Sequence, residues 1–480
     1  MDLSISMRMK KLIYYRLKYL KTLFIFFAFL WLGVFTANQG TKLFNFYYQL
    51  DIITILIINV LINGLIFSYL LSSDGISLRV IYSYYTFIFL SFVPIFQYLT
   101  GIWRFGFEFN LIRPFILLIN IGNLVYYCTY FLIGTKEKNK IKRLKPLNFN
   151  YNISERNLGL LSIPISIFAL TLISIYGFNP STSIVRTAMG TTHSPFESIL
   201  EFIFRPLVFF LFLFSFINLK FVSQQKSSIF LFLVYLLNVI LIINPLSSAR
   251  SITLFLYFPI LIIIFPPSHK KSFFYLFFLL FSIAGSFFQT EVRNLFLTGQ
   301  LKGFSVEYMF EGHFDGFEMG CHTLAFVQES GIEYGKQLAG ALLFFIPRKI
   351  WPSKPVGSGE YIGWEYLSKH FEVLWANFGM PLVAEAYLNF HFIGVLIFFI
   401  FIGRITFKLD YKFKLWQNSF YQNQKVRKFS FDQNMILYPM SLGFFLFALR
   451  GDLFSAFSFA TGLVISFLIA KKLIINKCTL

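Results

Sequence analysis

Charged residues are scarce in this chain. Asp, Glu, Lys and Arg make up 13% of its 480 residues, 56% are hydrophobic, and the mean hydropathy is +0.66. So little charge excludes a soluble globular domain and indicates an integral membrane protein. The sequence also has no internal repeat and no nucleotide-binding glycine loop, so neither feature supplies a function.

Cysteine is equally rare, with only Cys128, Cys321 and Cys478 present. In the topology derived below, the first lies in a membrane span, the second in an outer loop and the third in the inner tail. Because no two share a side of the membrane, the sequence excludes a chain held together by disulfides.

Long apolar runs dominate the rest of the chain and predict an all-α polytopic membrane protein, a single domain over residues 1–480 with about 12 transmembrane helices. A basic tail precedes the first run, but no small-residue cleavage site follows it, so we expect a retained helix and not a signal peptide. The predicted spans are Thr22 to Ala37, Ile52 to Leu71, Val80 to Leu99, Phe109 to Ile133, Leu158 to Phe178, Phe202 to Leu219, Ile229 to Leu246, Ile252 to Pro266, Phe273 to Phe288, Leu382 to Ile402, Met435 to Leu449 and Leu453 to Ala470.

The distribution of basic residues predicts the sidedness of these spans. With both termini in the cytoplasm, the inner segments hold 28 of the 42 Lys and Arg residues and 6 of the 22 Asp and Glu residues, so the inner face carries +22 and the outer face −2. Cytoplasmic loops are enriched in Lys and Arg, so this arrangement is the expected one. It also explains the net charge of +20 without nucleic acid as a partner.

Two polar segments then face outward: a short loop, 177–198, and a large loop between the ninth and tenth spans, 289–381. The large loop holds Glu291 and His313, which are candidate catalytic groups. If Glu311 to His322 is helical, then Glu311, Asp315, Glu318 and His322 share one face. That face could bind glycan, take part in catalysis, ligate a cation or simply be solvated.

Arginines gather at the outer ends of the spans and in the outer loops. A guanidinium group donates paired hydrogen bonds and stays charged, which suits a phosphate or pyrophosphate ligand. Arg250, Arg293 and Arg348 are the first candidates for such a site, with Arg186 and Arg450 as further ones. The alternative for each is that it reaches lipid headgroups or pairs with a nearby acid.

A proline-rich segment lies inside the large loop, from Ile346 to Pro355. Its three prolines predict an extended, non-helical path, and Trp351 offers a flat apolar face of the kind on which sugars stack. The alternative is a rigid cap at the membrane interface.

The C-terminal half, residues 245 to 455, resembles the oligosaccharide repeat-unit polymerases of bacterial surface polysaccharide synthesis, the O-antigen (Wzy-type) polymerases. The resemblance rests on four pieces in order: Ser248-Ala249-Arg250-Ser251, Glu291-Val292-Arg293, the stretch from Pro347-Arg348 to Pro355, and Ala384-Glu385-Ala386-Tyr387-Leu388-Asn389-Phe390 with Gly394. His391 departs from the pattern, because such sequences often place Gly after the aromatic residue.

The resemblance implies a GT-C-like architecture and an inverting glycosyltransferase that needs no metal and no cofactor. The growing glycan would leave undecaprenyl pyrophosphate and join an incoming carrier-linked repeat unit on the periplasmic face of the inner membrane. Catalytic roles are then expected for Arg250, Arg293, Arg348, Glu291 and His313, and substrate binding for Arg186, Trp351, Lys354, Asp315, Glu318, His322, Glu385 and Arg450. Expected partners are the carrier-linked oligosaccharide, membrane lipids, a chain-length regulator and a flippase.

Two other functions remain open. An O-antigen ligase has a similar layout but transfers the glycan to a lipid A core. A flippase or other transporter of lipid-linked oligosaccharide would be expected to spread its charge along a central cavity and to show repeat symmetry.

Overall fold

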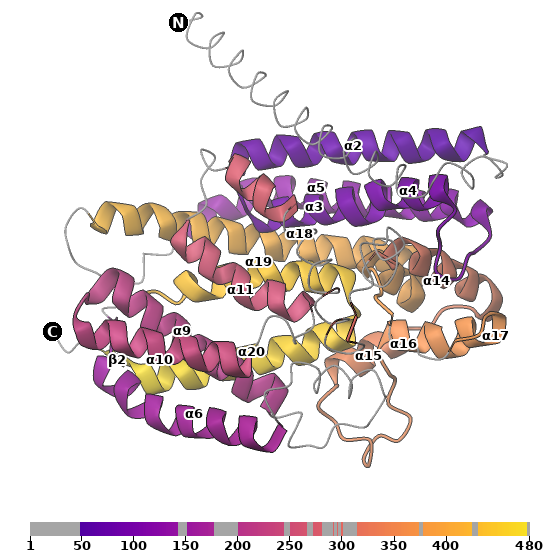
Figure 1. The fold of residues 1–480 in the computed structure, drawn as a ribbon. Coiled ribbons are helices and arrows are strands. Elements are labelled where there is room, and N and C mark those ends of the chain that lie inside the picture. Colours follow the sequence, from indigo (N-terminus) through magenta and orange to yellow (C-terminus); the bar gives the residue numbers. More distant parts are fainter. Residues whose placement is uncertain are drawn as a thin grey trace, which may run out of the picture.

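The computed structural model of the chain describes residues 49–142, 151–176, 200–243, 250–265, 272–280, 314–373, 378–424 and 431–477, together with residues 291, 295 and 299–300. This part is mostly helical, with a single short antiparallel sheet that pairs β1 (Tyr151–Ile153) with β2 (Ile475–Lys477). Long helices lie side by side with their axes in a common direction (Figure 1).

The elements follow in chain order. They are α2 (Leu50–Asp74), α3 (Leu78–Phe87), the π-helix η1 (Ile88–Phe92), α4 (Val93–Thr100), the short 3-10 helix η2 (Phe109–Leu111), α5 (Ile112–Lys142), α6 (Glu155–Tyr176), the π-helix η3 (Leu200–Phe204), α9 (Arg205–Ile217), the π-helix η4 (Asn218–Val222), α10 (Lys226–Ile242), α11 (Arg250–Ile264), α14 (Gly316–Ser330), α15 (Lys336–Leu342), α16 (Ser358–Ile362), the π-helix η6 (Gly363–Leu367), α17 (Ser368–His370), α18 (Leu382–Gln424), α19 (Asn434–Arg450) and α20 (Leu453–Ile474).

The described residues contain 6 helices long and apolar enough to cross a bilayer: Leu50–Asp74, Leu78–Thr100, Phe109–Leu132, Phe202–Val222, Leu382–Gln417 and Leu453–Ile474. The helices Lys226–Ile242 and Asn434–Arg450 are apolar but shorter. An all-α, membrane-embedded protein is thereby confirmed. The number of spans stays a prediction, and the predicted first span, Thr22 to Ala37, lies outside the described residues.

The helices bury their side chains in two neighbouring cores. One is built mainly from α2 to α5, α14 and the first part of α18, and the other from α6, α9, α10 and α20. Outward-facing apolar residues such as Leu65 and Ile163 remain 54% and 64% exposed. These residues form the surface that lipid would cover.

A buried amide network joins α2, η1 and α5 inside the first core. The Nδ2 of Asn63 donates to Asn59 Oδ1 at 2.9 Å and to Ser91 Oγ at 3.0 Å, and Asn123 donates to Asn63 Oδ1 at 3.1 Å. Tyr82 completes the network by donating to Asn123 Oδ1 at 2.6 Å. Polar side chains that satisfy one another fix the register of helices in a bilayer, where apolar packing alone discriminates poorly.

Asp410 of α18 organises the end of this core at which α3 begins. Its carboxylate accepts hydrogen bonds from the N–H of Leu78 at 2.9 Å and of Arg79 at 3.3 Å, and from the hydroxyls of Tyr130 at 2.9 Å and Tyr438 at 2.6 Å. The carboxyl oxygens of Asp410 thereby satisfy open N–H groups at the start of α3.

Segments to which the charge pattern gives the same side lie together. The Asp410 contact joins Arg79 to the late part of α18, and the sheet joins residues 151–153 to the C-terminal tail, all predicted to be cytoplasmic. The late part of α18 and β2 both lie at the left of Figure 1. This agrees with the predicted sidedness, although which face is cytoplasmic remains a prediction.

α18 departs from the prediction in two ways. The segment Arg404 to Lys428, expected to be a loop, is helical as far as Gln424, because no Gly or Pro follows Gly403 to end the helix. The predicted span Leu382 to Ile402 is also interrupted, by non-helical backbone at Phe390 and His391. His391 has a φ of 55°, a region that favours glycine, and it is the residue at which the sequence departs from the polymerase pattern.

We expect His391→Gly to raise the free energy of unfolding by about 1 kcal/mol over His391→Ala, because only glycine adopts this backbone without strain. Both substitutions lose the 2.8 Å contact between His391 Nε2 and the Tyr387 hydroxyl, so their difference isolates the backbone effect. Thermal unfolding of the two purified variants measures it. Equal midpoints would show that position 391 carries no strain.

Candidate functional site

The turn between α19 and α20, residues 450–453, lies at the centre of the candidate site. After Arg450, Gly451 and Asp452 have extended backbone, and α20 begins at Leu453. The Asp452 carboxylate caps α20 by accepting the N–H of Ser455 at 2.6 Å. The turn therefore has a fixed conformation.

Arg450 contacts a buried carboxylate in the large loop. One of its guanidinium nitrogens lies 3.6 Å from Asp315 Oδ1, and a nitrogen of Arg104 lies 3.6 Å from Asp315 Oδ2. The Asp315 side chain is 2% exposed, whereas those of Arg104 and Arg450 are 25% and 19% exposed. At 3.6 Å the groups attract one another but are too far apart for hydrogen bonds. Two guanidinium groups thus share one carboxylate and still reach the surface.

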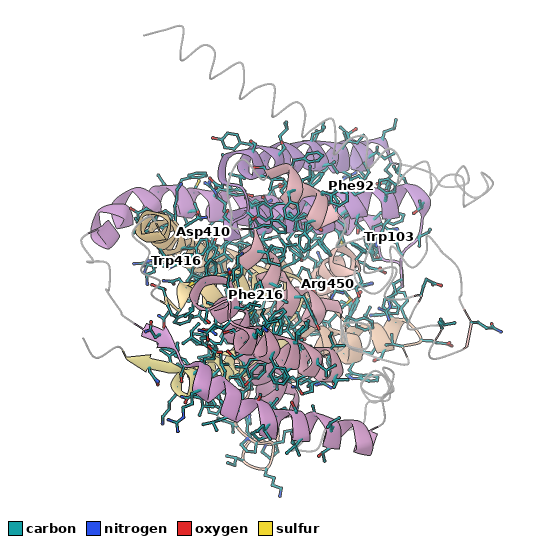
Figure 2. The ribbon with its side chains drawn as sticks, turned by 60° about the vertical axis from the view of Figure 1, so that its left-hand side comes forward. Phe92, Trp103, Phe216, Asp410, Trp416 and Arg450 are labelled. Carbon is teal, nitrogen blue, oxygen red and sulfur yellow. The ribbon has the colours of Figure 1, made fainter. Side chains whose placement is uncertain are left out.

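Gly379 permits this close arrangement. A Cβ at this position would lie 3.2 Å from the carbonyl oxygen of Arg450 and 3.5 Å from both its guanidinium group and Asp315 Oδ1. In Figure 2, Arg450 and Trp103, the residue before Arg104, lie to the right of Asp410, which anchors the other end of the first core.

Glu318 holds the loop that carries Arg104. Its carboxylate accepts three backbone N–H groups, from Arg104 at 2.9 Å, Phe105 at 2.7 Å and Gly106 at 3.0 Å. Gly106 has a φ of 78°, so a larger residue there would strain the loop. Glu318 therefore acts by positioning Arg104.

His322 stands one helical turn after Glu318. Its Nε2 lies 3.7 Å from Glu318 Oε1, and the ring packs among those of Phe105, Phe107 and Phe371. The predicted shared helix face is thus confirmed for Glu318 and His322, and both side chains are 1% exposed. The idea that this face is solvated is wrong, because α14 is buried between α18, α5 and the loop 101–108.

Burial raises the pKa of Asp315 to about 6, against the lowering effect of Arg450 and Arg104. The folded state therefore keeps a proton that the unfolded chain, with an ordinary Asp pKa of about 3.9, has already lost. We expect stability to fall as the pH rises from about 4 to about 6, by up to about 3 kcal/mol. Thermal unfolding of wild type and Asp315→Asn across this range measures the effect. The variant should lose this pH dependence, and identical profiles would contradict the assignment.

A second, acidic group contacts the same turn. Glu385, in the first turn of α18, is fully buried and accepts hydrogen bonds from Ser358 Oγ at 2.6 Å and from the N–H of Leu453 at 2.9 Å. Gly357 lets the chain approach, because a Cβ there would lie 2.4 Å from Asp452 Oδ2. Glu385 thus ties the start of α16 to the turn.

Glu360 of α16 is the partly exposed acid of this group. Burial and the neighbouring Asp452 raise its pKa, whereas Arg348 lowers it, and the Trp364 side chain is hydrogen-bonded to it. Asp452 follows Arg450 by two residues, so at most about 7 Å of backbone separates them. The turn therefore connects the arginine pair around Asp315 to an acidic group that includes a carboxylate with a raised pKa.

Three predicted site residues belong to the proline-rich segment. Arg348 is exposed and donates to the carbonyl of Lys354 at 2.7 Å, while the Lys354 ammonium donates to the carbonyls of Phe344 at 2.9 Å and Ile346 at 2.8 Å. Trp351 is half-buried. The segment is non-helical as predicted, but it forms successive turns and is not extended, as in the bond from Ile350 N to Pro347 O.

The remaining predicted residues are not brought into the site by the described structure. Arg186, Arg293 and His313 lie outside the described residues, as does the side chain of Arg250, which begins α11. Glu291 has helical backbone and is half-buried, and its immediate neighbours in the chain lie outside the described residues.

Sequence reasoning missed Arg104, Glu360 and Asp452 as site residues. Arg104 was visible as an arginine in an outer connection, but its contact with Glu318 spans 214 positions. Glu360 follows the proline-rich segment directly, and this was the available signal.

Within the described residues, no three His, Cys, Asp or Glu side chains converge as metal ligands. No protein-family model, curated protein or solved structure matches the chain.

Proposed function

We propose that this protein is an O-antigen polysaccharide polymerase, a glycosyltransferase that moves the growing glycan from undecaprenyl pyrophosphate to an incoming carrier-linked repeat unit. The observation that carries the proposal is the convergence of two arginines on Asp315: Arg104, just after the spanning helix Leu78–Thr100, and Arg450, just before the spanning helix Leu453–Ile474. A lipid carrier places its pyrophosphate at this level, just outside the hydrocarbon. The ordered motifs of the C-terminal half support the same class.

Arg104 and Arg450 would bind the carrier's pyrophosphate and stabilise the charge that develops as it leaves. Asp315 would position both guanidinium groups, because it lies 3.6 Å from each. Glu318 would fix the loop behind Arg104 through its three N–H contacts.

Glu360 would accept the proton of the attacking hydroxyl on the non-reducing sugar of the incoming unit. A carboxylate whose pKa is raised by burial and by Asp452 is a better proton acceptor than an ordinary glutamate. The bond from the anomeric carbon to the pyrophosphate oxygen breaks as the bond to the hydroxyl oxygen forms. Attack from the face opposite the departing pyrophosphate would invert the configuration at that carbon.

Deletion of the gene in its bacterial host tests the function. We expect surface lipid that carries a single repeat unit, because attachment to the lipid A core does not require polymerisation, and a restored glycan ladder on complementation. If the core instead lost all glycan while carrier-linked polymer accumulated, the protein would be the ligase. If carrier-linked units accumulated on the cytoplasmic face, it would be the flippase.

A further inference from the structure

The segment that runs from the last residue of α15 towards α16, residues 342–356 and here called the 342–356 loop, exposes an unusual number of large apolar side chains. Leu342, Leu343, Phe345 and Ile350 are 49%, 39%, 67% and 76% exposed. Clusters of this kind on a folded surface mark a contact with a partner or a membrane.

Internal hydrogen bonds fix the conformation of this loop and leave these side chains exposed. Its turns are closed by the N–H of Ile346 on the carbonyl of Leu343 at 3.0 Å and by that of Lys354 on the carbonyl of Trp351 at 3.1 Å. The Lys354 ammonium occupies the inside by donating to the carbonyls of Phe344 and Ile346. At the base of the loop, the Pro355 ring packs closely against Gly340 of α15. A Cβ added at Gly340 would lie only 3.0 Å from that ring.

The positive charge of the loop favours an anionic partner. Residues 342–356 contain Arg348, Lys349 and Lys354 and no acidic residue. Exposed apolar side chains next to cationic ones match the boundary between acyl chains and anionic headgroups. Trp351 is also a residue type that favours this boundary.

The position of the loop points to lipid as well. In Figure 1 the loop extends from α15 roughly perpendicular to the axes of the long helices. The helix α15 itself packs against α20. The neighbouring α20 carries an exposed apolar face, with Leu468 at 56%. The loop therefore adjoins a helix whose exposed apolar face suits lipid.

We infer that the 342–356 loop is a membrane-interface anchor: its four apolar side chains enter the leaflet beside the bundle, and Arg348 and Lys349 contact the phosphate groups of anionic lipid. The anchor leads directly into α16 and so holds Glu360 at the level of the headgroups. Only this last consequence rests on the proposed function.

Site-directed spin labelling of the full chain in lipid nanodiscs tests the anchor. Cys128 and Cys478 are replaced by Ser, and Cys321 stays because it is fully buried. A nitroxide is attached at Ile350→Cys and, as the matched control, at Tyr334→Cys, which is 83% exposed and precedes α15. In discs of phosphatidylcholine and phosphatidylglycerol, accessibility to a water-soluble nickel complex should be about threefold lower at position 350 than at position 334, with higher accessibility to oxygen. Equal values at both positions would overturn the inference.

A second set of measurements tests the headgroup contact. Lys349→Glu, or discs of phosphatidylcholine alone, should raise nickel accessibility at position 350 by about twofold, because attraction to anionic headgroups is lost. Nickel accessibility that ignores both changes would overturn this part. Protection of position 350 only in discs holding two copies would assign the loop to a protein interface and overturn the whole. None of these readouts depends on glycan transfer.

Discussion

Glu360→Gln is expected to slow glycan transfer by about two to four powers of ten, because the amide cannot take the proton of the attacking hydroxyl. The rate should be measured with purified protein and carrier-linked repeat units. The wild-type rate should also fall at acid pH, with a midpoint above the ordinary Glu value of about 4.3, since burial and Asp452 raise the pKa of Glu360. The variant should lack this acid limb.

The matched control is Glu365→Gln, on the π-helix that follows α16. Glu365 is 51% exposed and lies 3.4 Å from Lys369, so its removal should leave the rate unchanged. A Glu360→Gln enzyme that keeps the wild-type rate and acid limb would show that another group accepts the proton.

Arg450→Lys should slow transfer by one to two powers of ten. Lysine keeps the charge but loses the planar pair of donors, which costs about 2 to 3 kcal/mol if both bonds strengthen in the transition state. Arg104→Lys should behave similarly. The double variant should be slower than either single variant, but the combined factor should be smaller than the product of the two single factors, because both arginines hold one pyrophosphate.

Arg113→Lys is the control for general positive charge. Arg113 is 51% exposed and pairs with Asp51 at the surface of the bundle, so the rate should not change. Thermal unfolding of each variant separates lost chemistry from lost folding. An Arg450→Lys protein with the wild-type rate would reduce this residue to a headgroup contact or a partner of Asp315.

Six of the predicted spans coincide with helices long enough to cross a bilayer, as in Leu50–Asp74, because their apolar runs are long. It could not predict how the helices are shared between two cores, because lipid-facing and protein-facing side chains are equally apolar. Asp410 illustrates the gap, since its contact with Leu78 joins residues 332 positions apart.

The candidate site was predictable in part. The spacing of Glu318 and His322 indicated their shared helix face, and the outer position of Arg450 marked it as a candidate. Their setting was not predictable, because the burial of α14 depends on loop 101–108, whose backbone binds Glu318. The acidic group likewise forms only when Leu453 and Ser358 meet at Glu385.

Reconstitution of the purified protein with undecaprenyl-pyrophosphate-linked repeat units as the only substrate tests the central proposal most directly. The account predicts a ladder of carrier-linked products that grow by whole repeat units. With Glu360→Gln, this ladder should be absent. Failure to elongate these units, together with transfer of glycan to an added lipid A core or movement of intact units across the bilayer, would contradict it.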